Sequence, residues 1–380
     1  MRRLLPVLLC AAELLLFTGR GGLRNNYREV EQLLVVQTMG LDAEDGRMTV
    51  SLAAEGDSER GPKLLRAGGV SVSAAMERIH SYSYEEELFC PHIGRLLLGE
   101  KAAEAGIENV LAYICRSPEL RLDMPLFVVR GGTAEDAVMQ VGGGQTGICE
   151  VMRTVEQSAK RRGESNLTTV AQVLRDTERG GSALICALDL SAASESEKGG
   201  EDEQKSSVSA APLGYAILRE GRLCRYLTAE QGVAAGLLRN RPGTAALQLR
   251  DSHGNTAVLE ITGGSSRIRP VWDEGELTGL RVQTQVQAKL LELGGRGALK
   301  GTQDTDYLTA QLEAQLARYL RDTLQAEKDL RADFLCLAEC VERADPAAFR
   351  KQGRSFPDLL PELELEISVS ARLSQMNDMK

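Results

Sequence analysis

The sequence predicts an α+β protein in which mixed, mostly antiparallel sheets pack with helices in two to three subdomains. Its 380 residues are more than one hydrophobic core usually organises. In the first half, strand-like apolar runs alternate with helical periodicity, so helices should pack against a sheet. In the second half, apolar and polar residues alternate with period two over 277–293, which is typical of antiparallel strands with one buried face.

The first half opens with a predicted hairpin. Two apolar runs, 33–42 and 47–54, flank the turn sequence AEDG, and such a turn between strand-like runs favours a hairpin. Helical periodicity and a serine at the N-cap position predict a helix over 71–84. The other expected elements are strands at 92–99, 125–132 and 182–190, and helices at 100–116, 147–161 and 167–179.

The composition changes at 191–211, where Ser, Glu and Gly dominate and almost nothing apolar remains. Such a segment buries too little surface to offset its ordering entropy, so we expect a disordered linker. The expected divisions are a signal or anchor segment at 1–21, an N-terminal α/β domain at 22–190, the linker, and a C-terminal α+β region at 212–380 with two subdomains near 212–260 and 261–380.

A long helix is the strongest prediction in the second half. Leucine recurs every four residues from Leu308 to Leu324 within 304–337, which forms a slanted apolar stripe and favours a helix lying on a sheet. The other expected elements are a hairpin at 214–228, a helix at 229–240, strand-like runs at 244–251, 255–263, 266–272 and 277–293, and a closing strand at 362–375.

The N-terminus carries Arg2 and Arg3, followed by a 14-residue apolar segment that Glu13 interrupts. A membrane span needs about 20 residues, so this segment is better interpreted as a signal peptide, with a buried helix as the alternative. It ends in Thr18-Gly19, a pair that precedes the lipid-bearing cysteine in exported lipoproteins, but here Arg20 follows. Cys10 is a poor substitute because too little apolar length precedes it, so no lipidation is expected.

Charge and ligand spacing exclude several kinds of site. The net charge is −9, and a nucleic-acid partner would need a basic face, so none is expected. None of the eight cysteines forms a C-x-x-C pair and none of the three histidines has paired ligand spacing, so we expect neither metal nor cofactor. Seven cysteines directly follow Leu, Ile or Phe, as small buried side chains do. Cys336 and Cys340, four residues apart, are interpreted as core thiols, with half a metal site as the alternative.

No catalytic residue is expected. The glycine-rich loop at 141–147 lacks the lysine of a P-loop and the spacing of a dinucleotide fingerprint. His92 follows Pro91 at the mouth of an apolar strand and is interpreted as a structural histidine. Arg116 and Arg121 surround a Ser-Pro turn, where they either pair with neighbouring carboxylates or contact a partner.

The order of several short motifs resembles a known family. The first strand ends in Gly40-Leu41-Asp42, and then come His92, the apolar LLLGE at 96–100, a Gly-Ile turn and the segment RSPELR. Later motifs are FVVRGGTAEDA, GYAILREGRLCRYL, Asp333-Phe334 and RADPAAF. In this order and spacing, over roughly 25–375, the chain resembles the Ger(x)C family, the C subunits of spore-germination nutrient receptors.

This resemblance implies a non-enzymatic subunit on the outer face of the spore inner membrane, with a mixed α+β fold in three subdomains. It implies docking on the A- and B-type multi-span subunits of the same receptor, support for assembly or signalling in nutrient-triggered germination, and a germinant pocket in another subunit. His92, Arg116, Arg121 and Asp333 occupy motif positions and are candidates for partner contact. The family's lipid-bearing cysteine aligns with Arg20, so the chain departs from the family there.

Two other classes stay open on the sequence alone. An extracytoplasmic solute-binding protein would capture a small ligand itself, in an apolar pocket with convergent polar groups between the lobes. Its aromatic content of 4% argues against that alternative. An envelope hydrolase would need a nucleophile-base pair, which we do not find in the sequence.

Overall fold

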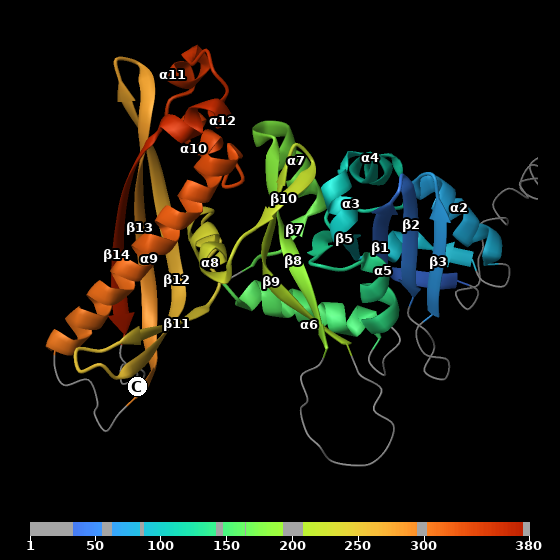
Figure 1. Ribbon diagram of the computed structural model, residues 1–380, viewed down its shortest axis with the longest axis horizontal. Coiled ribbons are helices and arrows are strands. Elements are labelled where there is room, and N and C mark those ends of the chain that lie inside the picture. The colour runs from blue at the N-terminus through green and yellow to red at the C-terminus, as the bar shows by residue number, and fades with distance from the viewer. Residues whose placement is uncertain are drawn as a thin grey trace, which may run out of the picture.

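The computed structural model describes residues 33–54, 63–83, 87–141, 147–163, 165–192, 208–294 and 302–374. The expected N-terminal segment with Cys10 and Arg20 lies outside these residues, as do 142–146 of the glycine-rich loop and 193–207 of the expected linker. The molecule is elongated (Figure 1), with a large sheet and its helices at one end and a smaller sheet crossed by one long helix at the other.

The larger sheet has ten strands, eight of them in the order β10-β9-β8-β6-β5-β1-β2-β3, while β4 pairs with β1 and β7 with β6. Its central neighbours β1, β5, β6 and β8 are parallel, and both flanks are antiparallel hairpins. The strands are β1 (Leu33–Glu44), β2 (Arg47–Ala54), β3 (Lys63–Gly69), β4 (Glu87–Phe89), β5 (Arg95–Gly99), β6 (Pro125–Val129), β7 (Thr168–Thr169), β8 (Ser182–Ala192), β9 (Val208–Arg219) and β10 (Arg222–Tyr226).

Helices cover both faces of this sheet. Successive strand side chains point to opposite faces, so Leu96 and Leu98 join one core while Leu97 joins the other. The short apolar run of β5 is therefore buried on both sides. One face carries α2 (Val72–Tyr82), α3 (Glu100–Ala105), α4 (Glu108–Arg116) and α7 (Val170–Gly180), and the other carries α5 (Ala134–Asp136), the π-helical turn η3 (Ala137–Val141) and α6 (Ile148–Arg161) (Figure 1).

The segment between β8 and β9 connects two paired strands. β8 and β9 run antiparallel, with Ser182 opposite Arg219 at one end and Ala192 opposite Val208 at the other. The ends of the expected linker, 191–192 and 208–211, therefore lie in strands. The expected C-terminal region thus contributes two strands, β9 and the edge strand β10, to the larger sheet. The sequence composition marks a loop here, but it does not show which strands pair across that loop.

The smaller sheet has the order β11-β12-β13-β14, and the long helix α9 lies on it (Figure 1). Leu308, Leu312 and Leu316 of the predicted stripe are fully buried in its core. The elements are β11 (Ala245–Arg250), β12 (Thr256–Asp273), β13 (Glu276–Leu293) and β14 (Glu364–Ser374), with α8 (Ala229–Leu238), α9 (Thr302–Leu330), α10 (Leu337–Ala344), α11 (Pro346–Lys351), α12 (Phe356–Leu359) and η4 (Leu360–Glu362).

Helix α8 joins the two sheets. Thr228 caps it, because its hydroxyl accepts the Gln231 N–H while the Gln231 side chain accepts the Thr228 N–H. Leu184 and Ile217 of the larger sheet belong to the same core cluster as α8, α9 and the smaller sheet. The hydrophobic core is therefore continuous between the two sheets.

Three expected elements differ in extent. The helix expected at 100–116 is two helices, because Gly106 has φ +116° and ends α3. The strand-like runs at 255–263 and 266–272 are one strand, β12, whose Gly263 and Gly264 stay paired with β13. This strand also crosses the expected subdomain boundary at 260–261. Helix α9 ends at Leu330 instead of 337, because Arg331 is left-handed with φ +48°.

Candidate functional site

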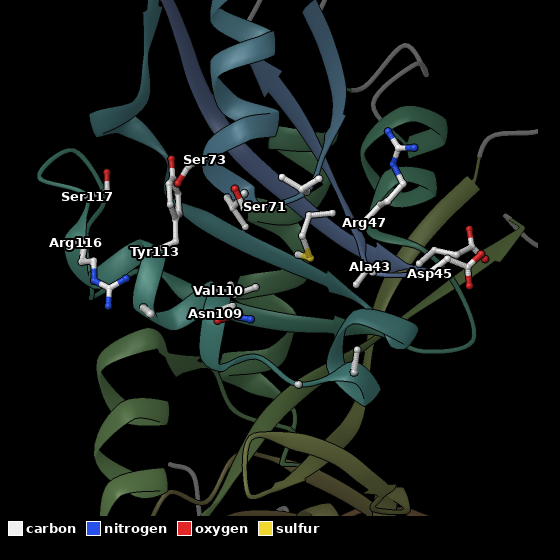
Figure 2. A pocket seen from close by; sticks show the side chains of 18 residues that line it. Ala43, Asp45, Arg47, Ser71, Ser73, Asn109, Val110, Tyr113, Arg116 and Ser117 are labelled. Carbon is white, nitrogen blue, oxygen red and sulfur yellow. The ribbon is translucent and has the colours of Figure 1, made fainter.

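A cavity of about 740 Å³ opens at one end of the larger sheet (Figure 2). Its walls are the turn between β1 and β2, the first turn of α2, and one face of α4. Cavities of roughly 300–1,000 Å³ with a few convergent polar groups are the usual size of small-molecule sites. The lining of this cavity is partly apolar and partly polar.

Local sequence chemistry fixes the walls. Asp45 and Gly46 both have positive φ, +50° and +75°, as the two-residue turn of a hairpin requires. The Ser71 hydroxyl accepts the Ala74 N–H at 3.2 Å and caps α2. The break at Gly106 lets α4 start in a new direction, so its residues Asn109, Val110 and Tyr113 line the cavity.

The floor of the cavity is apolar. Met48 and Val110 contribute side chains from β2 and α4, and Val72 does so from α2. Val70, which also lines the cavity, is 81% exposed. Single exposed apolar residues are ordinary on surfaces, and this one lies beside a floor in which Val72 and Val110 are only 4% and 2% exposed.

Polar side chains surround this floor. Arg47 and Arg116 lie at opposite ends of the cavity (Figure 2). Within the described part of the chain, neither arginine makes an ion pair or a hydrogen bond, and the Tyr113 hydroxyl has no hydrogen-bond partner. Burial raises the pKa of Tyr113, so its phenol stays neutral and can donate a hydrogen bond. By contrast, Glu44 at the rim is paired with Lys101.

The structure separates the two arginines that the sequence singled out together. Arg121 makes two hydrogen bonds to the Asp123 carboxylate, one of them from Nε at 2.9 Å. This pair is local and exposed, which agrees with the interpretation of Arg121 as a residue that holds its own turn. Arg116 makes no such pair with the described residues and lines the cavity instead.

Asp333 lies at a second polar cluster, inside the protein. Its carboxylate oxygens accept the N–H groups of Leu337 at 2.6 Å and of Ala338 at 3.1 Å, so it caps α10 from four residues before the first helical residue, Leu337. Glu327 of α9 is also fully buried, and its Oε1 accepts the Leu335 N–H at 2.9 Å. Burial raises the pKa of Asp333 to about 7.

The second cluster joins the two sheets. Arg239, which follows α8, has its Nη2 2.6 Å from Asp176 Oδ2 of α7 and 3.7 Å from the Cys336 sulfur. Gly180 at the end of α7 leaves room for Asp333, because a Cβ there would lie 3.2–3.3 Å from Asp333 atoms. Asp333 is therefore placed for packing and capping, away from the surface.

Two family models match the chain in tandem. The model for the spore germination protein N-terminal domain matches residues 26–190, and the model described as spore germination B3/GerAC like, C-terminal, matches 213–377. The chain belongs to the Ger(x)C family of germinant-receptor C subunits. Ger(x)C is not known as a family of enzymes.

The Ger(x)C fold is also seen in a solved structure. The "Crystal Structure of the GerBC protein" is similar to this chain with a TM-score of 0.57, 17% sequence identity, 88% of this chain and 96% of that chain covered. This similarity confirms the α+β fold. No curated protein sequence matches this Ger(x)C chain.

The remaining motif position of this Ger(x)C chain, His92, is exposed in the short helix η2 (Cys90–His92). Its ring packs on Phe89 with centroids 5.3 Å apart. The structure therefore brings none of His92, Arg116, Arg121 and Asp333 together in one site. Their common order in the sequence indicated the family, and their roles in contact with partners stay a prediction.

The cysteines are only partly as expected. The structure gives all seven described cysteines as free, and Cys90, Cys149 and Cys186 are buried. Cys115 of α4 and Cys224 of β10 are exposed, so the expectation that a cysteine after Leu or Ile is buried is wrong for these two. Cys336 precedes α10 instead of sharing a helical face with Cys340.

Metal-ligand clusters and membrane-spanning helices are both absent from the described residues. No group of three or more His, Cys, Asp or Glu side chains there could hold a metal ion. None of the described helices is long and apolar enough to cross a membrane.

Sequence reasoning missed the cavity and the carboxylate Glu327. Glu327 follows Leu324 by three residues, on the apolar face of α9, so a charged residue at an apolar position was the available signal. The cavity left no signal, because its walls are far apart in the sequence and become neighbours only through the sheet.

Proposed function

We propose that this chain is a non-enzymatic, membrane-associated subunit of a spore germinant receptor, which supports receptor assembly and nutrient-triggered germination. The observation that carries the proposal is the tandem match at 26–190 and 213–377, which takes in both sheets and the α8 junction. In this role the chain docks on A- and B-type multi-span subunits on the outer face of the spore inner membrane.

Burial and ion pairing reduce the number of motif residues that are available for docking. Asp333 is buried and Arg121 is occupied by Asp123. His92 and Arg116 are the two motif positions that are exposed without an ion pair in the described part of the chain. His92 stands with Phe89 as a small ring pair, which suits contact with a partner surface.

Membrane attachment is the part of the proposal that rests on sequence alone. We propose that the apolar segment before Arg20 is not cleaved and anchors the protein in the membrane, in place of the lipid that the family's cysteine would carry. It is shorter than a bilayer core, and a charged Glu13 near its centre costs about 2.5–3.5 kcal/mol. The anchor is therefore weak, and docking on the multi-span subunits shares in holding the protein.

The test is deletion and complementation in the sporulating host. Without this chain, the A- and B-type subunits should fail to assemble and germination with nutrients should fall, while vegetative growth stays normal. The full chain should restore both. A variant lacking 1–21 should leave the membrane fraction when the partner subunits are absent. Normal assembly and nutrient response in the deletion strain would overturn the proposal.

A specific observation also favours a second role, capture of a small ligand. The cavity beside α4 has the size and the mixed lining of a ligand site. The cavity lies among elements of the larger sheet and its helices. The sequence analysis expected such a pocket between two lobes of the protein. A ligand titration of the isolated protein tests this role separately from receptor assembly.

A further inference from the structure

We infer that the cavity between the β1–β2 turn, α2 and α4 binds a small monocarboxylate with an apolar body. Arg116 holds the carboxylate, and the body lies on Met48 and the exposed Val70. This site gives the second proposed role, capture of a small ligand, a ligand class, and it does not depend on the role as a receptor subunit. The ligand would bind to the isolated chain.

The balance of charge selects the Arg116 end for the anion. At the other end, the carboxylate residues Glu44 and Asp45 line the cavity beside Arg47. Glu44 is paired with Lys101. At the Arg116 end, no carboxylate lines the cavity. Glu119 is close enough to act on Tyr113 electrostatically, but it is exposed, so solvent and salt weaken its effect.

The Arg116 guanidinium supplies the hydrogen-bond donors for the anion at that end. A guanidinium binds a planar carboxylate through two parallel N–H donors, and Arg116 has all its donors free within the described part of the chain. Tyr113 lines the cavity from the same helix α4, but its hydroxyl lies toward Ser73 and away from the Arg116 guanidinium (Figure 2). One guanidinium without a counter-ion balances one negative charge, so a monoanion fits better than a dianion.

The apolar side chains of the cavity indicate that the body of the ligand is apolar. Val70 is 81% exposed at the rim, and a bound alkyl or aryl group would cover it together with the half-buried Met48. Transfer of apolar surface from water is favourable in proportion to the area removed. The cavity of about 740 Å³ is large enough for a body of eight or more heavy atoms, since pockets of this range hold drug-sized ligands.

The experiment is calorimetric titration of the full chain with octanoate, octanamide and inorganic phosphate. Octanoate should bind at one saturable site, octanamide about tenfold more weakly, and phosphate more weakly still, because a charge-assisted pair adds a factor of this order. Arg116→Gln should weaken octanoate binding about tenfold. The matched control Arg121→Gln removes a nearby arginine outside the cavity and should leave binding unchanged.

A second variant distinguishes loss of the binding site from loss of the folded structure. Ser73 is exposed in the first turn of α2 and lines the cavity, so Ser73→Trp should block binding without a change in Tm. The inference is overturned if octanoate shows no saturable binding, if Arg116→Gln binds as wild type does, or if phosphate binds more tightly than octanoate. Loss of subunit co-purification in Arg116→Gln without any octanoate binding would assign Arg116 to a partner contact instead. The deletion test of receptor assembly tests the proposed function only, and its outcome does not change the result of the octanoate titration.

Discussion

The guanidinium of Arg239 lies 2.6 Å from the carboxylate of Asp176, and both side chains are largely buried. This ion pair connects the residue that follows α8 with α7, so it spans the junction between the two sheets. Arg175 also reaches Asp176, at 3.0 Å from the other oxygen, but Arg175 is half exposed. The junction therefore depends on a charged pair that is mostly removed from water.

Replacement of Arg239 should be costly. Arg239→Ala leaves Asp176 buried with only the half-exposed Arg175, and loss of one partner of a buried pair costs about 3 kcal/mol of unfolding free energy. The control is Arg179→Ala, since Arg179 pairs across the same junction with Glu339 at 3.2 Å but is exposed, and exposed pairs contribute about 0–1 kcal/mol. Urea unfolding of both variants measures the difference. Equal losses would show that burial of the pair is unimportant.

Two carboxyl groups at the same junction have raised pKa values. Burial raises the pKa of Glu327 well above its usual range, and the neighbouring charge of Asp333 adds to the effect. Burial likewise raises the pKa of Asp333 to about 7, against the lowering effect of the N–H groups that it accepts. The folded protein therefore holds a proton here at pH values where the unfolded chain has released it.

Stability should fall as the pH rises through this window. The folded state binds more protons than the unfolded state between about pH 4 and pH 7, so the free energy of unfolding drops by up to about 1.4 kcal/mol per pH unit and proton. Glu327→Gln is neutral, keeps an oxygen for the Leu335 N–H and can donate to Asp333. We expect it to flatten the dependence of Tm on pH between 5 and 8, relative to wild type.

Asp333→Asn is the informative counterpart. Its amide nitrogen cannot accept the second of the two N–H groups from Leu337 and Ala338, so loss of that cap should cost about 1 kcal/mol at every pH. A Glu327→Gln variant that retains the full wild-type pH dependence would exclude Glu327 as a source of that dependence.

Local patterns predicted most elements of the fold. The serine cap of α2, the hairpin turn at Glu220-Gly221 and the leucine stripe of α9 follow from backbone and packing rules over a few residues. Glycine misled the prediction at Gly263–Gly264, where the chain continues as a strand, and was not recognised as a helix break at Gly106. Both errors arise because glycine permits a break without requiring one.

The candidate sites were less predictable. Pairing across long sequence distance decides which strands neighbour each other, so the sequence could not show that β9 and β10 extend the first sheet. It marked Arg116 but not the cavity that Arg116 lines, and it marked Asp333 but not Glu327 beside it. The order of the motifs was enough to indicate the family. The contacts of each motif residue depend on tertiary packing, which the sequence alone did not show.

Close approach of α2 to β3 should make Gly69 sensitive to substitution. A Cβ on Gly69 would lie 2.6 Å from the Ala75 backbone nitrogen, so Gly69→Ala must displace α2, which also forms a wall of the cavity. We expect a loss of about 1–3 kcal/mol, as for other overpacked sites. Gly68→Ala is the control, because its nearest atom would be 3.9 Å away. Thermal melts compare them, and similar Tm values for the two variants would contradict the close packing.

The segment at 193–207 should be the first site of limited proteolysis in a chain starting near Asn25. Its Ser-, Glu- and Gly-rich composition offers little surface to bury. Because β8 and β9 pair on both sides of it from Ser182–Arg219 to Ala192–Val208, and because α8 shares one core with both sheets, the two fragments should stay together after cleavage. Native gel filtration of the nicked protein should therefore give one peak, which separates into two fragments only in denaturant. Fragments that separate without denaturant would favour independently folding parts at 22–190 and 212–380, and earliest cuts inside 277–337 would contradict the division of the chain at this segment.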